Sequence, residues 1–201
     1  MKFHYIAIER EYGSGGQEIA ERLAQSMGIS CYGREIIRAV AEKQNISESQ
    51  IEYYEEHATS SFLYTIYAIG KAQSGNADML SKDGHIFVAE QEVIRQMAAV
   101  GPAVFVGHCA SEALKDTPGV LRVFIRSSEE EKRKRITAEY GIAESKVEST
   151  MRKFDHKRAN YYYVNTSRKW TDFNNYDMIL DSGNIGVDGC VSILKAILCK
   201  E

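Results

Sequence analysis

Two arginines and an aspartate follow one another at steps of three in the last third of the chain. Arg152, Asp155 and Arg158 belong to the stretch "MRKFDHKRANYY", which has a helical pattern. At this spacing we expect all three side chains on one helix face, where Asp155 orients both guanidinium groups. Two such groups can hold a phosphoryl group as it moves between donor and acceptor. The alternative is a solvated ladder of ion pairs, which is common on exposed helices.

A glycine-rich turn near the N-terminus is a second candidate for binding an anion. The stretch "IAIEREYGSGGQEIAERLA" combines an apolar run, a turn and a segment with helical spacing, and the turn consists of Gly13, Ser14, Gly15 and Gly16. Backbone N–H groups and the helix dipole converge at such a turn and favour phosphate. A phosphate-binding P-loop also has a lysine and a hydroxyl residue, but here Gly16 and Gln17 stand at those positions. Arg10 is the candidate for the missing cation. A tight turn without a ligand is the alternative.

Short apolar runs alternate with helical patterns along the whole chain. The five expected strands lie at residues 3–9, 29–32, 102–107, 120–126 and 176–183. Helical patterns occupy residues 16–28, 34–45, 47–57, 85–101, 127–141, 143–167 and 186–199. This alternation predicts a three-layer α/β/α fold with a five-stranded parallel sheet, in which ligands bind at the carboxyl ends of the strands.

Composition limits the function classes. The 201 residues suit one domain, and the net charge of −3 gives no support for binding nucleic acid or a membrane surface. The four cysteines are scattered, which predicts reduced thiols rather than disulfides, and no apolar run reaches the length of a membrane span. We therefore expect a cytoplasmic protein. His57, His85 and His156 show no ligand spacing, so no metal site built from protein side chains is expected.

Taken in order, these motifs resemble the cytidylate kinases, and more closely the cytidylate kinase-like family whose first loop reads "REYGSGG". The resemblance covers nearly the full length. It rests on the first loop and on the segments "YGREIIRAVA", "AVFVGHCASEALKD", "RVFIRSSEEEKRKRI", "RKFDHKR" and "YDMILDSGNIGVDGCVSILKAI". "RKFDHKR" is similar to the R-x-x-D-x-x-R motif of the family's lid.

The resemblance implies a single P-loop kinase-like domain over residues 1–201, with an acceptor-binding helical insert at 45–84 and an arginine lid at 141–168. It also implies transfer of a phosphoryl group from ATP, bound with Mg²⁺, to CMP or a similar monophosphate. Arg38 and His108 match residues that contact the acceptor, although His108 replaces an arginine. Arg135 is a candidate for contacting the donor nucleotide.

Two alternatives remain open at this point. One is a nucleotide or phosphate sensor without catalysis, because the loop lacks its lysine, and the other is a kinase of another small phosphorylated acceptor. We expect small nucleotides as partners, with no nucleic acid and no membrane. A homodimer is one possible assembly. The tyrosines at 161–163 could stack on a base, but we expect them instead to pack a helix end against the core or to form a dimer contact.

Overall fold

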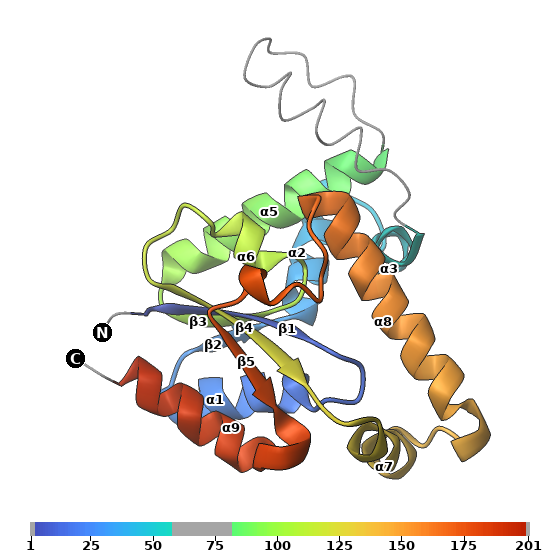
Figure 1. Ribbon diagram of the computed structural model, residues 1–201. Coiled ribbons are helices and arrows are strands. Elements are labelled where there is room, and N and C mark those ends of the chain that lie inside the picture. Colours follow the sequence, from blue (N-terminus) through green and yellow to red (C-terminus); the bar gives the residue numbers. More distant parts are fainter. Residues whose placement is uncertain (1–2, 58–81, 200–201) are drawn as a thin grey trace.

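The computed structural model describes residues 3–57 and 82–199, and Figure 1 shows their arrangement. The expected insert at residues 45–84 is therefore described only at its two ends, because residues 58–81 lie outside the described residues. Helix α3 (Glu48–His57) precedes this gap and helix α5 (Lys82–Val100) follows it.

The sheet has five parallel strands in the order β2-β3-β1-β4-β5. These strands are β1 (Tyr5–Arg10), β2 (Ser30–Tyr32), β3 (Ala103–Val106), β4 (Val120–Arg126) and β5 (Met178–Asp181). Each coincides with an expected apolar run to within two residues. Because β1 is central and pairs with both β3 and β4, the loops that follow these three strands meet at one edge of the sheet.

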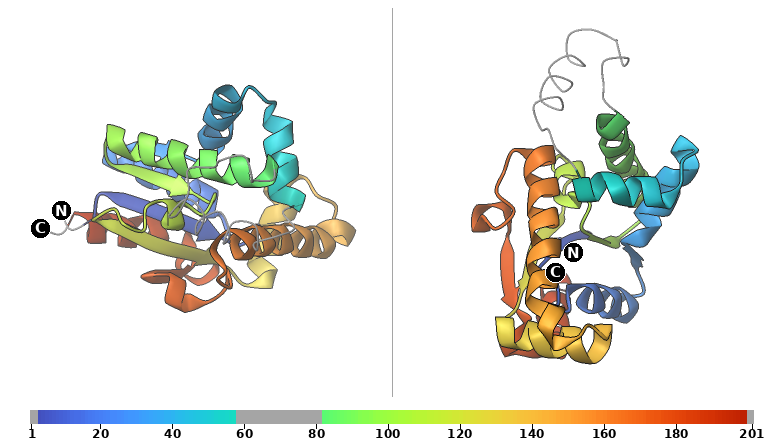
Figure 2. Two further views of the ribbon diagram at one scale, coloured as in Figure 1. Left: turned by 90° about the horizontal axis from the view of Figure 1, so that it is seen from above. Right: turned by 90° about the vertical axis from the view of Figure 1, so that its right-hand side faces the viewer.

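Helices cover both faces of the sheet, as Figures 1 and 2 show. One face carries α1 (Gly16–Met27) and α9 (Ser182–Leu198), and the other carries α2 (Arg34–Gln44), α5 and α6 (Ala110–Ala113). Strand β1 alternates accordingly, since Ile6 and Ile8 join the core under α1 and α9 while Ala7 joins the opposite core. Burial of each isoleucine contributes about 1.5–3 kcal/mol. The predicted three-layer α/β/α fold is confirmed.

Two helices form an arm beside the edge at which the strands end (Figure 1). Helix α7 (Glu129–Tyr140) begins after a side-chain cap, in which the Ser128 hydroxyl accepts a hydrogen bond from the N–H of Glu131. Helix α8 (Glu144–Thr166) packs on α7 through a small apolar cluster of Ile136, Val147 and Met151. Although α8 has 23 residues, neither it nor any other helix within the described residues is long and apolar enough to cross a membrane.

Three local features differ from the sequence expectation. Helix α6 and the 3₁₀ helix η2 (Phe173–Asn175) were not expected, because each is too short to show a period. Helix α9 starts at Ser182 rather than at residue 186, since the Asp181 carboxylate caps the N–H groups of Gly183 and Asn184. The expected start is instead a kink, where Gly186 has non-helical dihedral angles.

Candidate functional site: an arginine-lined cavity at the glycine loop

The loop between β1 and α1 has the geometry of an anion-binding turn. Gly13 and Gly15 adopt left-handed backbone, and Gly15 directly precedes α1. No acceptor among the residues that the structure describes bonds the N–H groups of Gly15, Gly16 and Gln17. Unbonded N–H groups at a helix start carry the positive end of the helix dipole, so they favour a negatively charged ligand.

The Arg10 side chain runs across this loop toward the end of β3. A Cβ atom on Gly16 would lie 2.5 Å from the Arg10 Cβ, and one on Gly107 would lie 2.3 Å from the Arg10 Nη1. Both positions therefore need glycine to let the side chain pass. Arg10 was predicted as the candidate for the missing cation, but no sequence pattern indicates this path. The path brings the guanidinium group to the cavity between the loops after β1 and β3.

Arg158 brings a second guanidinium group to the same place from α8. Its Nη1 donates a hydrogen bond of 2.9 Å to the carbonyl oxygen of Arg10, and both arginines line the cavity. Burial, followed by repulsion from Arg10, lowers the pKa of Arg158 to about 10, so the group stays charged at neutral pH. Two cations held this close in a partly dry site are stabilised by an anion between them.

Asp155 connects α8 to the glycine loop rather than joining two arginines. One of its oxygens accepts a hydrogen bond of 2.6 Å from the N–H of Tyr12 and lies 3.9 Å from Arg158 Nη1. Burial raises the pKa of Asp155, and the Tyr12 N–H and Arg158 partly offset this. The Tyr12 ring also stacks on Phe154, with ring centroids 4.6 Å apart. These contacts fix the distance between the helix and the loop.

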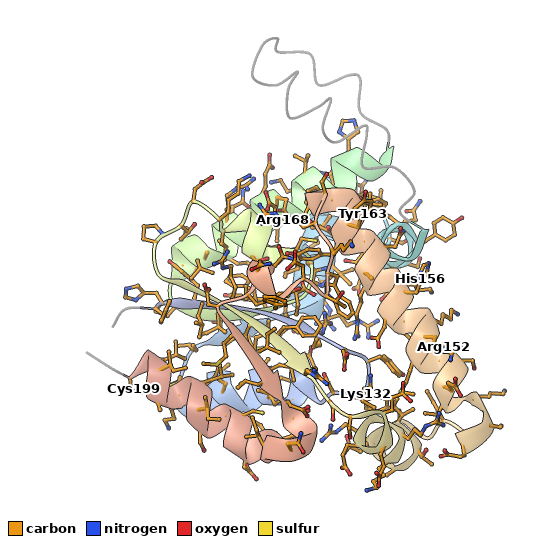
Figure 3. All side chains as sticks on the ribbon, viewed as in Figure 1. Lys132, Arg152, His156, Tyr163, Arg168 and Cys199 are labelled. Atoms are coloured by element: carbon orange, nitrogen blue, oxygen red, sulfur yellow. The ribbon has the colours of Figure 1, made fainter. Side chains whose placement is uncertain are left out.

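Arg152 does not join this group, which corrects the expectation that all three residues share one face. Its side chain is 80% exposed and pairs with Glu148 at 2.7 Å, and it lines a separate surface groove together with His156 (Figure 3). The reason is geometric: each residue of a helix turns by about 100°, so positions six apart differ in direction by roughly 120°. The expected role of Asp155 in orienting both arginines is therefore restricted to Arg158.

Arg135 covers the glycine loop from α7. Its Nη1 donates a hydrogen bond of 3.1 Å to the carbonyl oxygen of Gly13, and its Cζ lies 3.0 Å from where a Cβ of Gly15 would be. Its Nε is buried and makes no hydrogen bond to a described residue. Ser14 is fully buried and its hydroxyl bonds the Glu11 carbonyl oxygen at 2.8 Å, so this side chain has a structural role in the loop.

These residues fit a bound polyphosphate. Three backbone N–H groups without acceptors lie near three guanidinium groups, and the buried Arg135 Nε makes no hydrogen bond, although it lies 3.5 Å from a carboxylate oxygen of Glu139. The side chain of Gln17, at the position of the usual Mg²⁺-binding hydroxyl, bonds Glu21 at 2.8 Å instead. A Mg²⁺ ion that arrives with ATP would therefore be held mainly by phosphate oxygens and water.

The cavity extends from Arg10 toward the region of the expected insert and has a volume of about 780 Å³. On its far side lie Arg34 and Arg38, which project from α2 at helical spacing. Arg34 pairs with Glu52 at 3.2 Å, and Arg38 pairs loosely with Glu48 at 3.8 Å and is 60% exposed. Solvent-exposed pairs of this kind are weak, so both arginines can turn to an anionic ligand.

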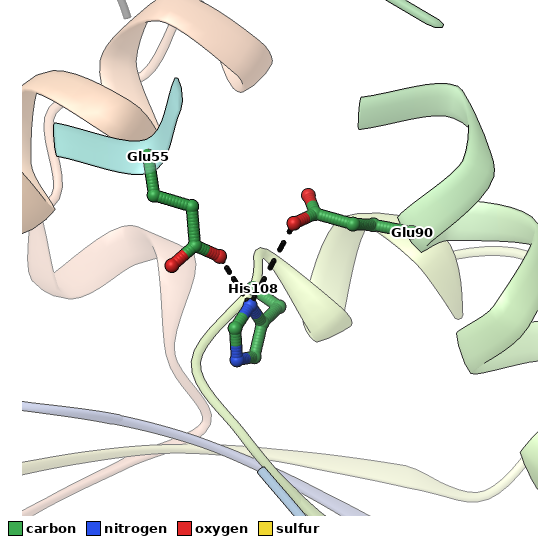
Figure 4. Close-up of side chains that lie close together, drawn as sticks. All are labelled: Glu55, Glu90 and His108. Atoms are coloured by element: carbon green, nitrogen blue, oxygen red, sulfur yellow. Dashed lines mark hydrogen bonds and ion pairs between the residues drawn. The ribbon is translucent and has the colours of Figure 1, made fainter. Parts of the chain in front are cut away.

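His108 takes part in a partly buried cluster that the sequence did not indicate. Its Nδ1 lies 2.5 Å from a carboxylate oxygen of Glu55 and 3.9 Å from one of Glu90 (Figure 4). Burial, together with the negative charge of Glu55, raises the pKa of Glu90 well above its usual range. Burial alone would also raise the pKa of Glu55, but the attraction of His108 outweighs it and the pKa is lowered. The three residues come from separate elements, so no local spacing reveals them.

Comparisons with known proteins place the chain among phosphotransferase folds. The model of the cytidylate kinase-like family matches residues 5–184. An uncharacterised protein from Eubacterium ventriosum ATCC 27560 is 27% identical with a TM-score of 0.70, and the match covers 98% of this chain and 99% of that one. Shikimate kinase from Bacteroides thetaiotaomicron is 11% identical, with a TM-score of 0.51 and coverage of 96% and 97%. TT1252 from Thermus thermophilus is 15% identical, with a TM-score of 0.53 and coverage of 98% and 97%. No curated protein matches the chain significantly.

Proposed function

The chain belongs to the cytidylate kinase-like family, and from this premise we propose that it transfers the γ-phosphoryl group of ATP to CMP or a similar small monophosphate. The observation that carries this proposal is the convergence of Arg10 and Arg158 at the glycine loop. Two guanidinium groups there supply the positive charge that a P-loop lysine otherwise gives. They also offer forked donors that fit phosphate oxygens better than an ammonium group.

Each residue around the loop has a distinct role in this proposal. The N–H groups of Gly15, Gly16 and Gln17 bind donor phosphate oxygens. The Arg10 side chain passes Gly16, and its guanidinium group beside Gly107 neutralises charge on the phosphates in the cavity. Arg158 stabilises the charge that spreads over the transferring group, and its bond to the Arg10 carbonyl holds it in place beforehand. ATP with its Mg²⁺ supplies the phosphoryl group and further charge neutralisation.

The acceptor binds on the opposite side of the cavity. Arg34 and Arg38 exchange their weak carboxylate partners for the acceptor phosphate, which is itself an adequate nucleophile and needs no general base. His108 does not replace the family arginine here, because its Nδ1 is engaged by Glu55. The volume of about 780 Å³ lies within the range of small-molecule sites.

A coupled assay with ATP and Mg²⁺ across CMP, dCMP, UMP, AMP and GMP tests the proposal on the full chain. We expect turnover of CMP or one of its relatives, and a loss of about 10²–10³-fold in kcat for Arg158→Ala, as for other charge-stabilising donors. Lys153→Ala is the matched control, because it removes an exposed cation from the same helix. Loss of activity in both variants would contradict the role of Arg158.

A sensor without catalysis is the second candidate, and one contact favours it. Arg135 and Ile136 lie against the glycine loop, so α7 limits access to the loop in this conformation. Saturable ATP binding with no turnover of any acceptor would support the sensor over the kinase. Absence of both ATP binding and turnover would reject both candidates.

A further inference from the structure

Glu55, Glu90 and His108 bring three ligand atoms together from three separate elements. Glu55 projects from α3, Glu90 from α5, and His108 from the loop after β3. One ligand atom from each residue lies within 4.8 Å of the other two. Figure 4 shows both carboxylates turned toward the imidazole ring, and the dashed lines both end on its Nδ1.

Glu90 supplies an independent sign that a ligand belongs here. The residue is fully buried, with 0% of its surface exposed, and no described donor bonds its Oε1 when both nearby carboxyl groups are ionised. A proton shared between Glu55 and Glu90 can form a hydrogen bond between them. Glu90 Oε1 faces His108, while the other oxygen accepts a hydrogen bond from the Tyr161 hydroxyl. Two buried carboxylates without a cation or a shared proton cost free energy, and a metal ion between them and His108 would remove that cost.

We propose that Glu55, Glu90 and His108 bind a divalent transition-metal ion, with Zn²⁺ as the best-fitting class, through the imidazole Nδ1 and one oxygen of each carboxylate. A mixed nitrogen and oxygen set suits Zn²⁺ and disfavours Mg²⁺, which takes oxygen ligands. Three protein ligands leave a fourth tetrahedral position for water or a substrate group.

Only small changes in the distances between the ligand atoms are needed to form this metal site. Ligand atoms around a tetrahedral Zn²⁺ lie roughly 3.3 Å apart, so the Glu55–His108 distance must lengthen by about 0.8 Å and the Glu90–His108 distance must shorten by about 0.6 Å. Changes of this size are within the range of side-chain rotation. The Tyr161 hydroxyl orients Glu90, and the Gln91 side chain bonds the His108 carbonyl oxygen at 3.3 Å. Such outer partners typically hold metal ligands in place.

The open position of this metal site faces the cavity, because Glu55 and His108 line its wall while Glu90 lies behind them. A bound ion would thus contact a small molecule on the acceptor side through an oxygen or nitrogen ligand. The proposal concerns the three side chains alone. Metal binding is measured without ATP or an acceptor, so its failure is separate from a failure of the proposed kinase activity.

The test uses the full chain after treatment with a chelator. Titration with Co²⁺ should produce visible absorption of a bound ion at one equivalent, and titration calorimetry with Zn²⁺ should give the same stoichiometry. We expect His108→Ala and Glu90→Gln each to weaken Zn²⁺ binding by about 100-fold or more, because each removes one of three ligands. Glu92→Gln is the matched control, since this half-exposed residue of α5 pairs with Lys43.

Glu90→Gln alters a fully buried side chain and could fail to fold, so circular dichroism of each variant checks folding. Glu55→Gln is a second ligand variant, because the Glu55 side chain lies at the cavity wall. Zn²⁺ should raise the melting temperature of the natural chain and of Glu92→Gln, but not that of His108→Ala. Absence of Zn²⁺ and Co²⁺ binding by the natural chain would overturn the proposal. Equal affinity in the natural chain and His108→Ala would overturn it too, because the ion would then lie elsewhere.

Discussion

Replacement of Gly107 by alanine tests the path of the Arg10 side chain. The new Cβ would lie 2.3 Å from Arg10 Nη1, whereas an ordinary contact begins near 3.4 Å, so the guanidinium group must move by about 1 Å. Gly107 also has a φ of 77°, and left-handed backbone costs a residue with a Cβ roughly 1–2 kcal/mol.

These two effects have separate readouts. The backbone term lowers the melting temperature by about 2–8 °C in a domain of this size, at 2–4 °C for each kcal/mol. The displaced guanidinium group acts on function, and a misplacement of about 1 Å in a catalytic site can reduce kcat/KM by about 100-fold. ATP affinity, measured by calorimetry, is expected to fall as well.

Gly141→Ala is the control for backbone strain, because Gly141 has a φ of 66° and no atom within 4 Å of the added Cβ. It should lower the melting temperature but leave ATP affinity unchanged. In an Arg10→Ala background, Gly107→Ala should cause no further loss of activity, since the group it displaces is gone. Full activity of Gly107→Ala, or additive losses in the double variant, would show that Arg10 does not pass Gly107 as described.

Three further predictions follow from individual side chains. Arg152→Ala should reduce kcat by less than about 5-fold, while Arg158→Ala reduces it by about 100-fold or more, because only Arg158 lines the cavity; equal losses in steady-state assays would contradict this. Burial raises the pKa of Glu9 above its ordinary 4.5, so folding favours the protonated form. The free energy of unfolding therefore falls as the pH rises from 4.5 through the raised pKa of the folded state. Glu9→Gln keeps an acceptor for the Trp170 N–H and should raise the melting temperature at pH 7 more than at pH 4; an equal rise at both would reject this. Ile136→Ala removes a fully buried side chain and should lower the free energy of unfolding by about 2–5 kcal/mol in urea titrations, whereas a loss below about 1 kcal/mol would show that α7 does not pack on the loop as described.

The regular elements could be predicted because each follows from a local pattern. The buried strands β1, β3 and β4 are continuous apolar runs, which parallel strands covered on both faces require. The start of α7 also follows from a local pattern, because Ser128 stands three residues before Glu131 as in a capping box. The order of the strands then placed the glycine loop and the segment after β3 at one edge. The position of these two segments at one edge of the sheet could therefore be predicted from the sequence.

Side-chain direction accounts for what could not be predicted. Arg10 reaches Gly107 only because β1 and β3 are neighbours, although the two residues lie far apart in the chain. His108 meets Glu55 because three consecutive residues, Gly107 to Cys109, have left-handed backbone, and nothing in the residue types of His108 and Cys109 indicates this. The predicted position of Arg152 was wrong because residues three apart lie on one helix face, whereas Arg152 and Arg158 are six apart and point in directions that differ by roughly 120°.

The role of Arg10 as the replacement for the missing lysine of the loop can be measured by titrating the protein with ATP in the presence of Mg²⁺, for the natural chain and for Arg10→Ala. We expect saturable binding to the natural chain. The affinity of Arg10→Ala should be about 10- to 100-fold weaker, because a charged hydrogen bond worth about 1.5–3 kcal/mol is lost. Equal affinity for both proteins, with both correctly folded, would contradict it.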